Sequence, residues 1–228
     1  MRVKEIIFLV VAITVAGCNE SRTPDPETLG YDFYPIQVGQ FRIYDVEEVT
    51  YRVLSFDTAV YQLRETIFDS IVSLDQVSYL IRRDVRSDAQ QEWQSDSIWS
   101  VTRKSSYLSI TENGIPFIKL TFPVGNGNQW DGNSLNSNGE LIYYYESLPT
   151  AVIDTIAQED HVRVILEDIE ENITGIDLRS EVYVRGIGLV EKDYLTQIKC
   201  TSSSCGEDLG KVVAGRSLKQ ILIEVGNE

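Results

Sequence analysis

The chain has 228 residues, of which 20 are lysine or arginine and 35 are aspartate or glutamate, so its formal net charge is −15. This acid excess argues against nucleic acid as a partner, because nucleic-acid-binding domains usually present a basic surface. It also argues against electrostatic attraction to anionic membranes. The length is enough for one sizeable hydrophobic core, and we expect a single domain after the N-terminal segment.

The first eighteen residues have the form of a bacterial lipoprotein signal. A charged start, Met1–Glu5, precedes an apolar run, Ile6–Ala16, which is too short for a transmembrane helix of ~20 residues. Val15–Cys18 then resembles a lipobox, because small residues precede the cysteine at the expected cleavage site. We expect residues 1–17 to be removed and Cys18 to carry diacylglycerol, with its amine acylated. Several acyl chains make a stable anchor, since each buried methylene contributes ~0.8 kcal/mol.

The alternative for this segment is an ordinary secretory signal that happens to contain a cysteine. After the cysteine, residues 18–30 are polar and contain two prolines, which is typical of a flexible tether. Asn19, rather than an aspartate, follows the cysteine and favours the outer over the inner membrane. The sequence leaves open whether the protein faces the periplasm or the cell surface.

Residues 31–228 have the pattern of an all-β domain. Short runs of β-branched and aromatic residues alternate with polar turns, which favours an antiparallel, strongly curved sheet of the half-barrel, barrel or sandwich kind. The expected strands are residues 41–46, 49–53, 60–68, 77–85, 97–103, 107–111, 115–122, 141–145, 162–169, 181–185, 189–198 and 218–225. Asn113-Gly114 predicts a tight hairpin turn.

Two other stretches of the domain need an interpretation. Gly186 and Gly188 interrupt an expected strand, which is typical of a bulge or bend where a sheet curls. Residues 151–164 are the nearest candidate for a helix, although Asp154 interrupts their apolar pattern.

The chain contains three cysteines. Cys18 is assigned to the lipid, and Cys200 and Cys205 lie in a polar turn between two apolar runs. In an oxidising compartment such a pair is expected to form a disulfide. A redox centre more often has two residues between its cysteines. A zinc site would lack ligands, because His161 is the only histidine.

The loop that begins at Trp130 is rich in turn-forming residues. Asp131, Asn133 and Asn136 can hold a loop through side-chain hydrogen bonds that mimic backbone turns. The same three residues, with Glu140, are also oxygen donors and form a candidate calcium site, although calcium requires about 6–8 oxygens. Trp130 could instead stack on a sugar or a lipid at the mouth of a pocket. The sequence leaves these alternatives open.

Three motifs together resemble an uncharacterised family of Bacteroidota lipoproteins. They are Tyr34-Pro35 with Val38-Gly39-Gln40-Phe41, then Trp130-Asp131-Gly132-Asn133, and Gly186-Ile187-Gly188-Leu189-Val190. Phe41 stands where this family usually has tryptophan. The resemblance spans most of residues 31–195 and implies a lipid-anchored β domain, but it implies no activity.

These observations lead to one functional expectation and two alternatives. We expect a noncatalytic, lipid-anchored envelope protein that binds an apolar ligand or a protein partner through its curved sheet; the ligand rests on architectural analogy with half-barrel carriers and lipocalins. The first alternative is a structural or assembly accessory of the outer membrane. The second is a carboxylate-based hydrolase, which would bring two carboxylates together in a pocket beside Trp130.

Overall fold

The structure, a computed structural model, describes residues 26–53, 55–73, 76–125, 127–146 and 160–228. Its strands form one antiparallel sheet of 12 strands in the order β6-β5-β4-β3-β2-β1-β12-β11-β10-β9-β8-β7. The predicted all-β, curved antiparallel fold is therefore confirmed. The expected lipoprotein signal, Cys18 and the first part of the expected tether lie outside the described residues.

The strands differ widely in length. Their bounds are β1 (Gln40–Arg52), β2 (Ser55–Ser73), β3 (Gln76–Arg86), β4 (Gln94–Arg103), β5 (Tyr107–Glu112), β6 (Ile115–Thr121), β7 (Gln129–Asp131), β8 (Ile142–Glu146), β9 (His161–Ile169), β10 (Gly175–Val184), β11 (Gly188–Lys199) and β12 (Val212–Asn227). The described residues also form three short helical segments, α2 (Pro26–Leu29), η1 (Tyr31–Phe33) and η2 (Ser203–Asp208).

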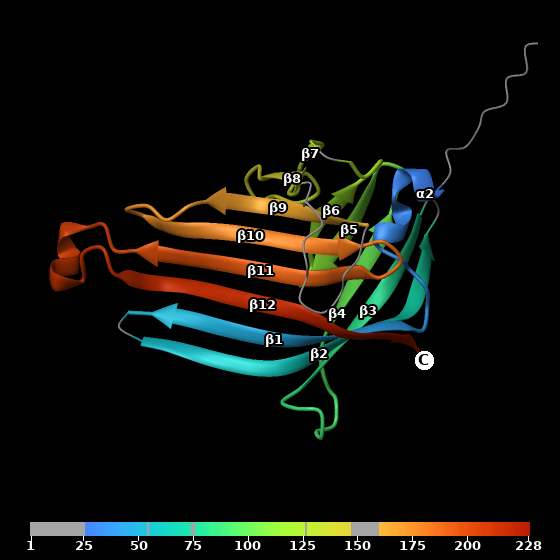
Figure 1. The fold of residues 1–228 in the computed structure, drawn as a ribbon, viewed down its shortest axis with the longest axis horizontal. Coiled ribbons are helices and arrows are strands. Elements are labelled where there is room, and N and C mark those ends of the chain that lie inside the picture. Colours follow the sequence, from blue (N-terminus) through green and yellow to red (C-terminus); the bar gives the residue numbers. More distant parts are fainter. Residues whose placement is uncertain (1–25, 54, 74–75, 126, 147–159) are drawn as a thin grey trace, which may run out of the picture.

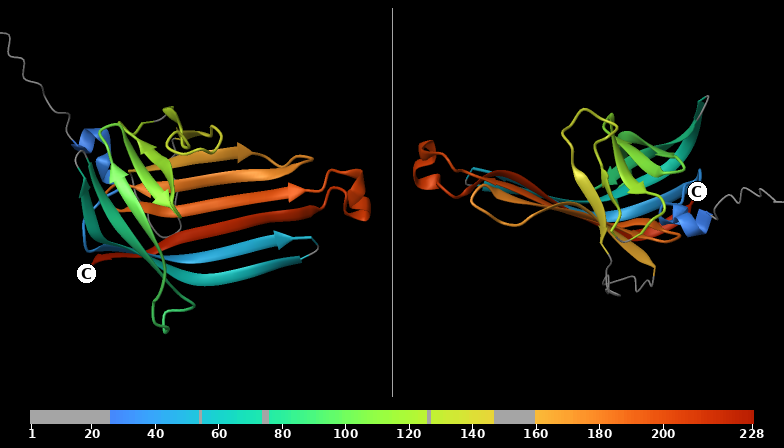
Figure 2. Two further views of the ribbon diagram at one scale, coloured as in Figure 1. Left: turned by 180° about the vertical axis from the view of Figure 1, so that it is seen from behind. Right: turned by 90° about the horizontal axis from the view of Figure 1, so that it is seen from above.

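The sheet curls until its two outermost strands meet. In Figure 1 the strands from β9 through β12 to β1 and β2 run side by side, and β3 to β6 cross them steeply. The view from above in Figure 2 shows β3 to β6 rising from the layer of long strands. Where the edges meet, the amide of Ile118 on β6 donates to the carbonyl of Gly132, just after β7, at 2.9 Å. We call this the closed end, and the opposite end of the long strands the flared end.

The hydrophobic core lies at the closed end. The larger cluster contains Trp99 of β4, Tyr143 and Tyr145 of β8, and Tyr183 of β10. A second cluster includes Tyr44 and packs between β1, β2 and the strands that follow β9. Because large aromatic side chains fill this end, the space between the curled strands is occupied by protein.

The folded part begins earlier than the sequence predicted. Within the expected tether, Pro26–Leu29 forms α2, and the carbonyl of Leu29 accepts a hydrogen bond from the amide of Val124 at 3.0 Å. In η1, the carbonyl of Asp32 accepts from the amide of Gly186 at 2.8 Å. These bonds fix the segment after residue 25 to the closed end, where α2 appears in blue (Figure 1).

Several local predictions can be compared with the structure. Asn113-Gly114 does form the hairpin turn between β5 and β6, with positive φ angles of 51° and 84°. The two strands expected at residues 41–46 and 49–53 are instead one strand, β1. Glu47 is exposed there, and Glu48 pairs with Arg216 of β12 at 2.9 Å, so neither glutamate breaks the strand.

Two further predictions were less accurate. Gly186 and Gly188 do not interrupt a strand, because Gly186 lies in the turn that joins β10 to β11 and Gly188 is the first residue of β11. Both glycines have positive φ, 77° and 102°, which suits a tight turn. Of the helix candidate at residues 151–164, the last residues belong to β9, and residues 151–159 lie outside the described part.

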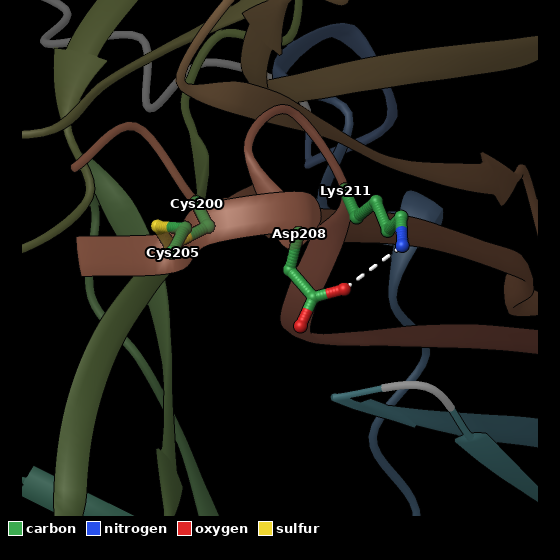
Figure 3. Close-up of a disulfide and its surroundings, with 4 residues drawn as sticks. All are labelled: Cys200, Cys205, Asp208 and Lys211. Atoms are coloured by element: carbon green, nitrogen blue, oxygen red, sulfur yellow. Dashed lines mark hydrogen bonds and ion pairs between the residues drawn. A yellow bond between two sulfur atoms is a disulfide. The ribbon is translucent and has the colours of Figure 1, made fainter. Parts of the chain in front are cut away.

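The predicted disulfide is present at the flared end. Cys200 and Cys205 are bonded, with their Cα atoms 6.1 Å apart, in the loop between β11 and β12 (Figure 3). Lys211 and Asp208 form an ion pair of 2.9 Å in the same loop. None of the helices in the described part of the chain has the length and apolar character needed to cross a bilayer.

Candidate functional site

Charged side chains cross the inner face of the closed end. Residues directly opposite each other in an antiparallel ladder share a face, so the register defines a row across seven strands. This row is Tyr145, Val164, Glu181, Lys192, Gln220, Val46 and Tyr61. Glu181 is 1% exposed and Lys192 is 6% exposed, although carboxylates and ammonium groups are seldom buried unless they are paired.

A β-bulge brings a second lysine to this row. Leu108 pairs with Leu120 and Ser109 pairs with Ile118, so Lys119 is the extra residue on β6. Bulges redirect side chains, and here Lys119 becomes buried next to Leu120 instead of pointing to solvent. The edge strand β6 therefore supplies an ammonium group to the interior.

The lysines bind two carboxylates. The Nζ of Lys119 lies 2.9 Å from the Oε1 atoms of both Glu112 and Glu181, and the Nζ of Lys192 lies 3.4 Å from Glu181 Oε1. The hydroxyls of Tyr183 and Tyr194 donate to Glu181 at 2.5 Å each. We call these six residues the ion network. It joins β5 and β6 to β10 and β11 through the interior of the closed end.

Mutual pairing sets the protonation of the network. Burial raises the pKa of the Glu181 carboxyl, but Lys119, Lys192 and the two tyrosine hydroxyls outweigh it, and the net pKa is far below its usual range. The pKa of Glu112 is also lowered, because Lys119 and Lys192 outweigh its burial. Burial lowers the pKa of Lys119, but the two carboxylates raise it well above the ordinary lysine value. The carboxylates of Glu112 and Glu181 and the ammonium of Lys119 are therefore charged at neutral pH, and the hydroxyls of Tyr183 and Tyr194, whose pKa values are raised, stay protonated.

Further charges connect this interior to the surface. Arg83 on β3 lies 3.1 Å from Glu65 and 3.6 Å from Asp96. Its guanidinium also lies 3.7 Å from the ring centroid of Trp99, and the Nζ of Lys192 lies 5.9 Å from the same ring. Trp99 thus contacts cations from β3 and β11, within the range of cation–π attraction.

A hollow of about 660 Å³ opens beside Arg83. Its wall combines apolar and charged groups from β2, β3 and the start of β4. The residues that line it are 58–61, Leu63, Arg83, Val85, Arg86, Ser87, Gln91, Glu92, Gln94 and Asp96. We call it the β2 hollow. Its volume is within the range of small-molecule sites, and its mixed wall differs from the wholly apolar groove that an apolar ligand would need.

The loop after Trp130 has a clear structural arrangement. Asp131 Oδ1 accepts hydrogen bonds from the amides of Asn133 at 2.9 Å and Leu141 at 3.0 Å. Asn133 donates to Gly139 O at 2.6 Å, and Asn136 donates to Pro116 O at 2.8 Å. These side chains hold the loop together and attach it to β6, as the loop-holding interpretation expected.

Trp130 itself helps to close the sheet. Its indole Nε1 donates to the carbonyl of Ile118 at 2.9 Å, and its ring lies 4.7 Å from that of Tyr145. It thus packs in the core and bridges β7 to β6. Over the described ranges, no three His, Cys, Asp or Glu residues gather in a group that could hold a metal ion. Calcium at Asp131, Asn133 and Asn136 stays a prediction.

The ion network was not predicted from the sequence. The local signal was a charged residue inside an apolar run, as at Lys119 between Ile118 and Leu120. Such a residue in a strand is read as solvent-facing by alternation, and only the bulge and the curling of the sheet place it inside.

The fold and the site define a class of architecture: an antiparallel sheet nearly closed into a barrel, with an ion-paired interior and a hollow beside it. No protein-family model, curated protein or solved structure matches this chain.

Proposed function

We propose that this chain is a noncatalytic, lipid-anchored bacterial envelope protein that binds a ligand or protein partner through its curved sheet, at the β2 hollow. The observation that carries the proposal is the hollow itself, about 660 Å³ with apolar and charged groups on one wall. The closed end is filled by large side chains, so the hollow is a better place for a ligand than the interior.

The chemistry of the wall favours a partner with both apolar and polar groups. Val60 and Val85 offer apolar surface, and Arg86 and Glu92 offer charge. An acyl chain alone would leave these charges without partners, which is costly in a desolvated contact. An amphipathic molecule or a polypeptide segment suits the hollow better.

The protonation of the ion network supports a noncatalytic role. A carboxylate-based hydrolase of the usual kind needs one carboxyl group with a raised pKa to donate a proton. Burial raises the pKa of Glu112 and Glu181, but the charges of Lys119 and Lys192 outweigh it, so both pKa values are lowered instead. Neither residue lines the β2 hollow. Their arrangement suits a structural ion cluster better than a proton donor beside bound substrate.

The proposal can be tested by filling the hollow. Ala59 is exposed on β2 and lines it, so Ala59→Trp should occupy the space and abolish binding. Ala214→Trp on β12 is the matched control, because Ala214 is also an exposed strand alanine but does not line the hollow. The measurement is native mass spectrometry of the full lipoprotein after gentle extraction from its own membranes.

The wild type and Ala214→Trp should carry the same additional mass, and Ala59→Trp should carry none. If the wild type carries no ligand or protein, or if Ala59→Trp retains it, the β2 hollow is not the binding site.

A separate observation favours the assembly accessory as a second candidate. At the flared end a further hollow of about 610 Å³ lies between the loop holding Cys200 and the β9–β10 turn. Ile173 and Leu209 line it and are 83% and 59% exposed. Apolar side chains this exposed are typical of contact surfaces when they cluster. Loss of a copurifying envelope protein in Ile173→Ser, but not in Ala59→Trp, would favour this role.

A further inference from the structure

We propose that the open edge of β2, residues 55–61, binds an extended segment of a partner polypeptide as an additional strand. The inference rests on the proposed function and deepens it, because it names the class of ligand that enters the β2 hollow. Residues 58–61 of this edge also line the hollow.

The register shows which backbone groups face outward. Arg52 pairs with Ser55, so the β1–β2 hairpin has a two-residue loop, and the pair beside such a loop is hydrogen-bonded within the hairpin. Alternation then directs the N–H and C=O groups of Phe56, Thr58 and Val60 away from β1. The partner strand β3 begins to pair with β2 only at Gln62. Within the described residues, no strand pairs with the outer side of residues 55–61.

This edge lacks the protection that exposed edges usually have. Natural proteins guard open edges with charged residues, prolines or bulges. Residues 55–61 contain no proline or lysine, and their one charged residue, Asp57, is ion-paired with Arg52 of the same hairpin. Phe56 and Val60 are both 67% exposed on one face. An edge of this composition is a template for a further strand.

The opposite edge of the flared end provides a contrast. β8 pairs with β9 only as far as Ile165, so the end of β9 is also open. That stretch carries two carboxylates, Glu167 and Asp168, and a bulge lies in its pairing with β10 at Arg179/Ser180. Of these two open edges at the flared end, the one on β2 is therefore the less protected.

The chemistry of the edge identifies the occupant as polypeptide. Outward N–H and C=O groups recur at every second residue, about 6.8 Å apart, which matches the repeat of another extended chain. Main-chain bonds of this kind supply affinity in strand addition, and side-chain pockets supply selectivity. The β2 hollow is such a pocket, placed at the end of the open edge.

Charge indicates which kind of polypeptide is suited. Arg83 is already paired with Glu65, and Arg86 lies 4.2 Å from the ring centroid of Trp93. Glu92 lines the hollow and forms no ion pair with any described residue. A segment with lysine or arginine would complement Glu92 and be attracted to a chain of net charge −15, whereas a second copy would be repelled.

The test uses the full acylated protein in detergent and a displayed library of random twelve-residue peptides. In the variant Thr58→Pro the outward N–H is lost, and the β1–β2 ladder is kept because that N–H does not belong to it. Thr58→Ala is the matched control, since it keeps the N–H. We expect peptides with alternating apolar residues and at least one basic residue. Their affinity should fall roughly tenfold or more when Thr58→Pro replaces the wild type, or when alternate amides of the peptide are N-methylated. Their affinity for Thr58→Ala should equal that for the wild type.

The proposal is overturned if no peptide is recovered, or if the recovered peptides bind Thr58→Pro or their N-methylated forms equally well. Self-association of the wild type that Thr58→Pro abolishes would also overturn it, in favour of a second copy. Circular dichroism checks the fold of Thr58→Pro. If that variant unfolds, the test uses Val60→Pro in its place, because Val60→Pro removes the next outward N–H. If Ala59→Trp releases the native ligand but Thr58→Pro does not, the proposed function stands and strand addition does not.

Discussion

Glu181 is the residue on which the interior of the closed end depends most. It receives two tyrosine hydroxyls and two lysine ammonium groups. Tyr183 is on its own strand, Lys192 and Tyr194 are on the next strand, and Lys119 is 62 residues away in the sequence. Buried ion pairs add little net stability compared with apolar residues, but they are costly to break. The network is therefore better understood as fixing which strands meet than as the main source of stability.

We expect Glu181→Gln to lower the free energy of unfolding by about 3–5 kcal/mol, because Lys119 and Lys192 would stay buried with one carboxylate fewer. Urea unfolding measures this change. Glu171→Gln is the control, since Glu171 pairs with Lys199 at the surface and its loss should change stability little. Equal effects of the two substitutions would contradict a structural role for the network.

The same variant should change how stability depends on pH. The pKa of Glu181 is lowered in the folded state, whereas an unfolded glutamate titrates near ~4.3. As the pH falls below about 4, the unfolded state takes up protons first, and stability is lost. Unfolding measured from pH 7 down to pH 3 should therefore be less pH-dependent in Glu181→Gln than in the wild type. If the free energies of unfolding of Glu181→Gln and the wild type fell in parallel with pH, Glu181 would not be the source of the acid-induced loss of stability.

At the scale of elements, the β10–β11 turn is fitted closely to β1. Arg42 of β1 donates to the carbonyl of Ile187 at 2.7 Å, and a Cβ on Gly188 would lie 2.8 Å from the Arg42 Nε. A Cβ on Gly186 would meet no atom within 4 Å. Glycine is thus required at position 188 by both its positive φ and the close approach of Arg42, and at position 186 by its positive φ alone.

We expect Gly188→Ala to destabilise the protein more than Gly186→Ala. Both substitutions place alanine at a positive φ, which costs roughly 1–2 kcal/mol, but only Gly188→Ala also displaces a buried arginine. Thermal unfolding of the two variants measures the difference. If Gly186→Ala proved the more destabilising, close approach of Arg42 would not be the reason for Gly188.

Elements were predictable where the signal is local. Asn113-Gly114 defines its own turn, and Cys200 and Cys205 are near enough in sequence to form a disulfide without knowledge of the fold. Glu47-Glu48 was read as a break because the sequence does not reveal that Arg216 lies opposite Glu48. The bulge at Lys119 depends on the register with β5, which is likewise a non-local property.

For the whole molecule, strand periodicity predicts a curved sheet but does not say which edges meet. Closure depends on single contacts between distant residues, such as the amide of Ile118 with the carbonyl of Gly132. The β2 hollow arises because β3 leaves β2 at Gln62, and no pattern in the sequence marks that point. The candidate site was therefore not predictable from the sequence, although the fold class was.

The proposed attachment to the membrane is also a property of the whole molecule. We expect Cys18→Ser to abolish acylation, so that the protein leaves the membrane fraction while its fold is kept. Fractionation, with mass spectrometry of the amino terminus, measures this. A variant that still sediments with membranes and keeps an unaltered amino terminus would contradict the lipobox interpretation.

The chain enters the fold at α2 and ends at the same end of the long strands, whereas the disulfide loop lies at their far end (Figures 1 and 2). If the protein is bound through Cys18, as proposed, the end with α2 would be the anchored end, and the flared end would extend away from the bilayer. The 16-residue strand β12 alone extends on the order of 50 Å. The hairpin loops at the flared end would then lie beyond the lipid headgroups, where they could contact envelope proteins that are not bound to the bilayer.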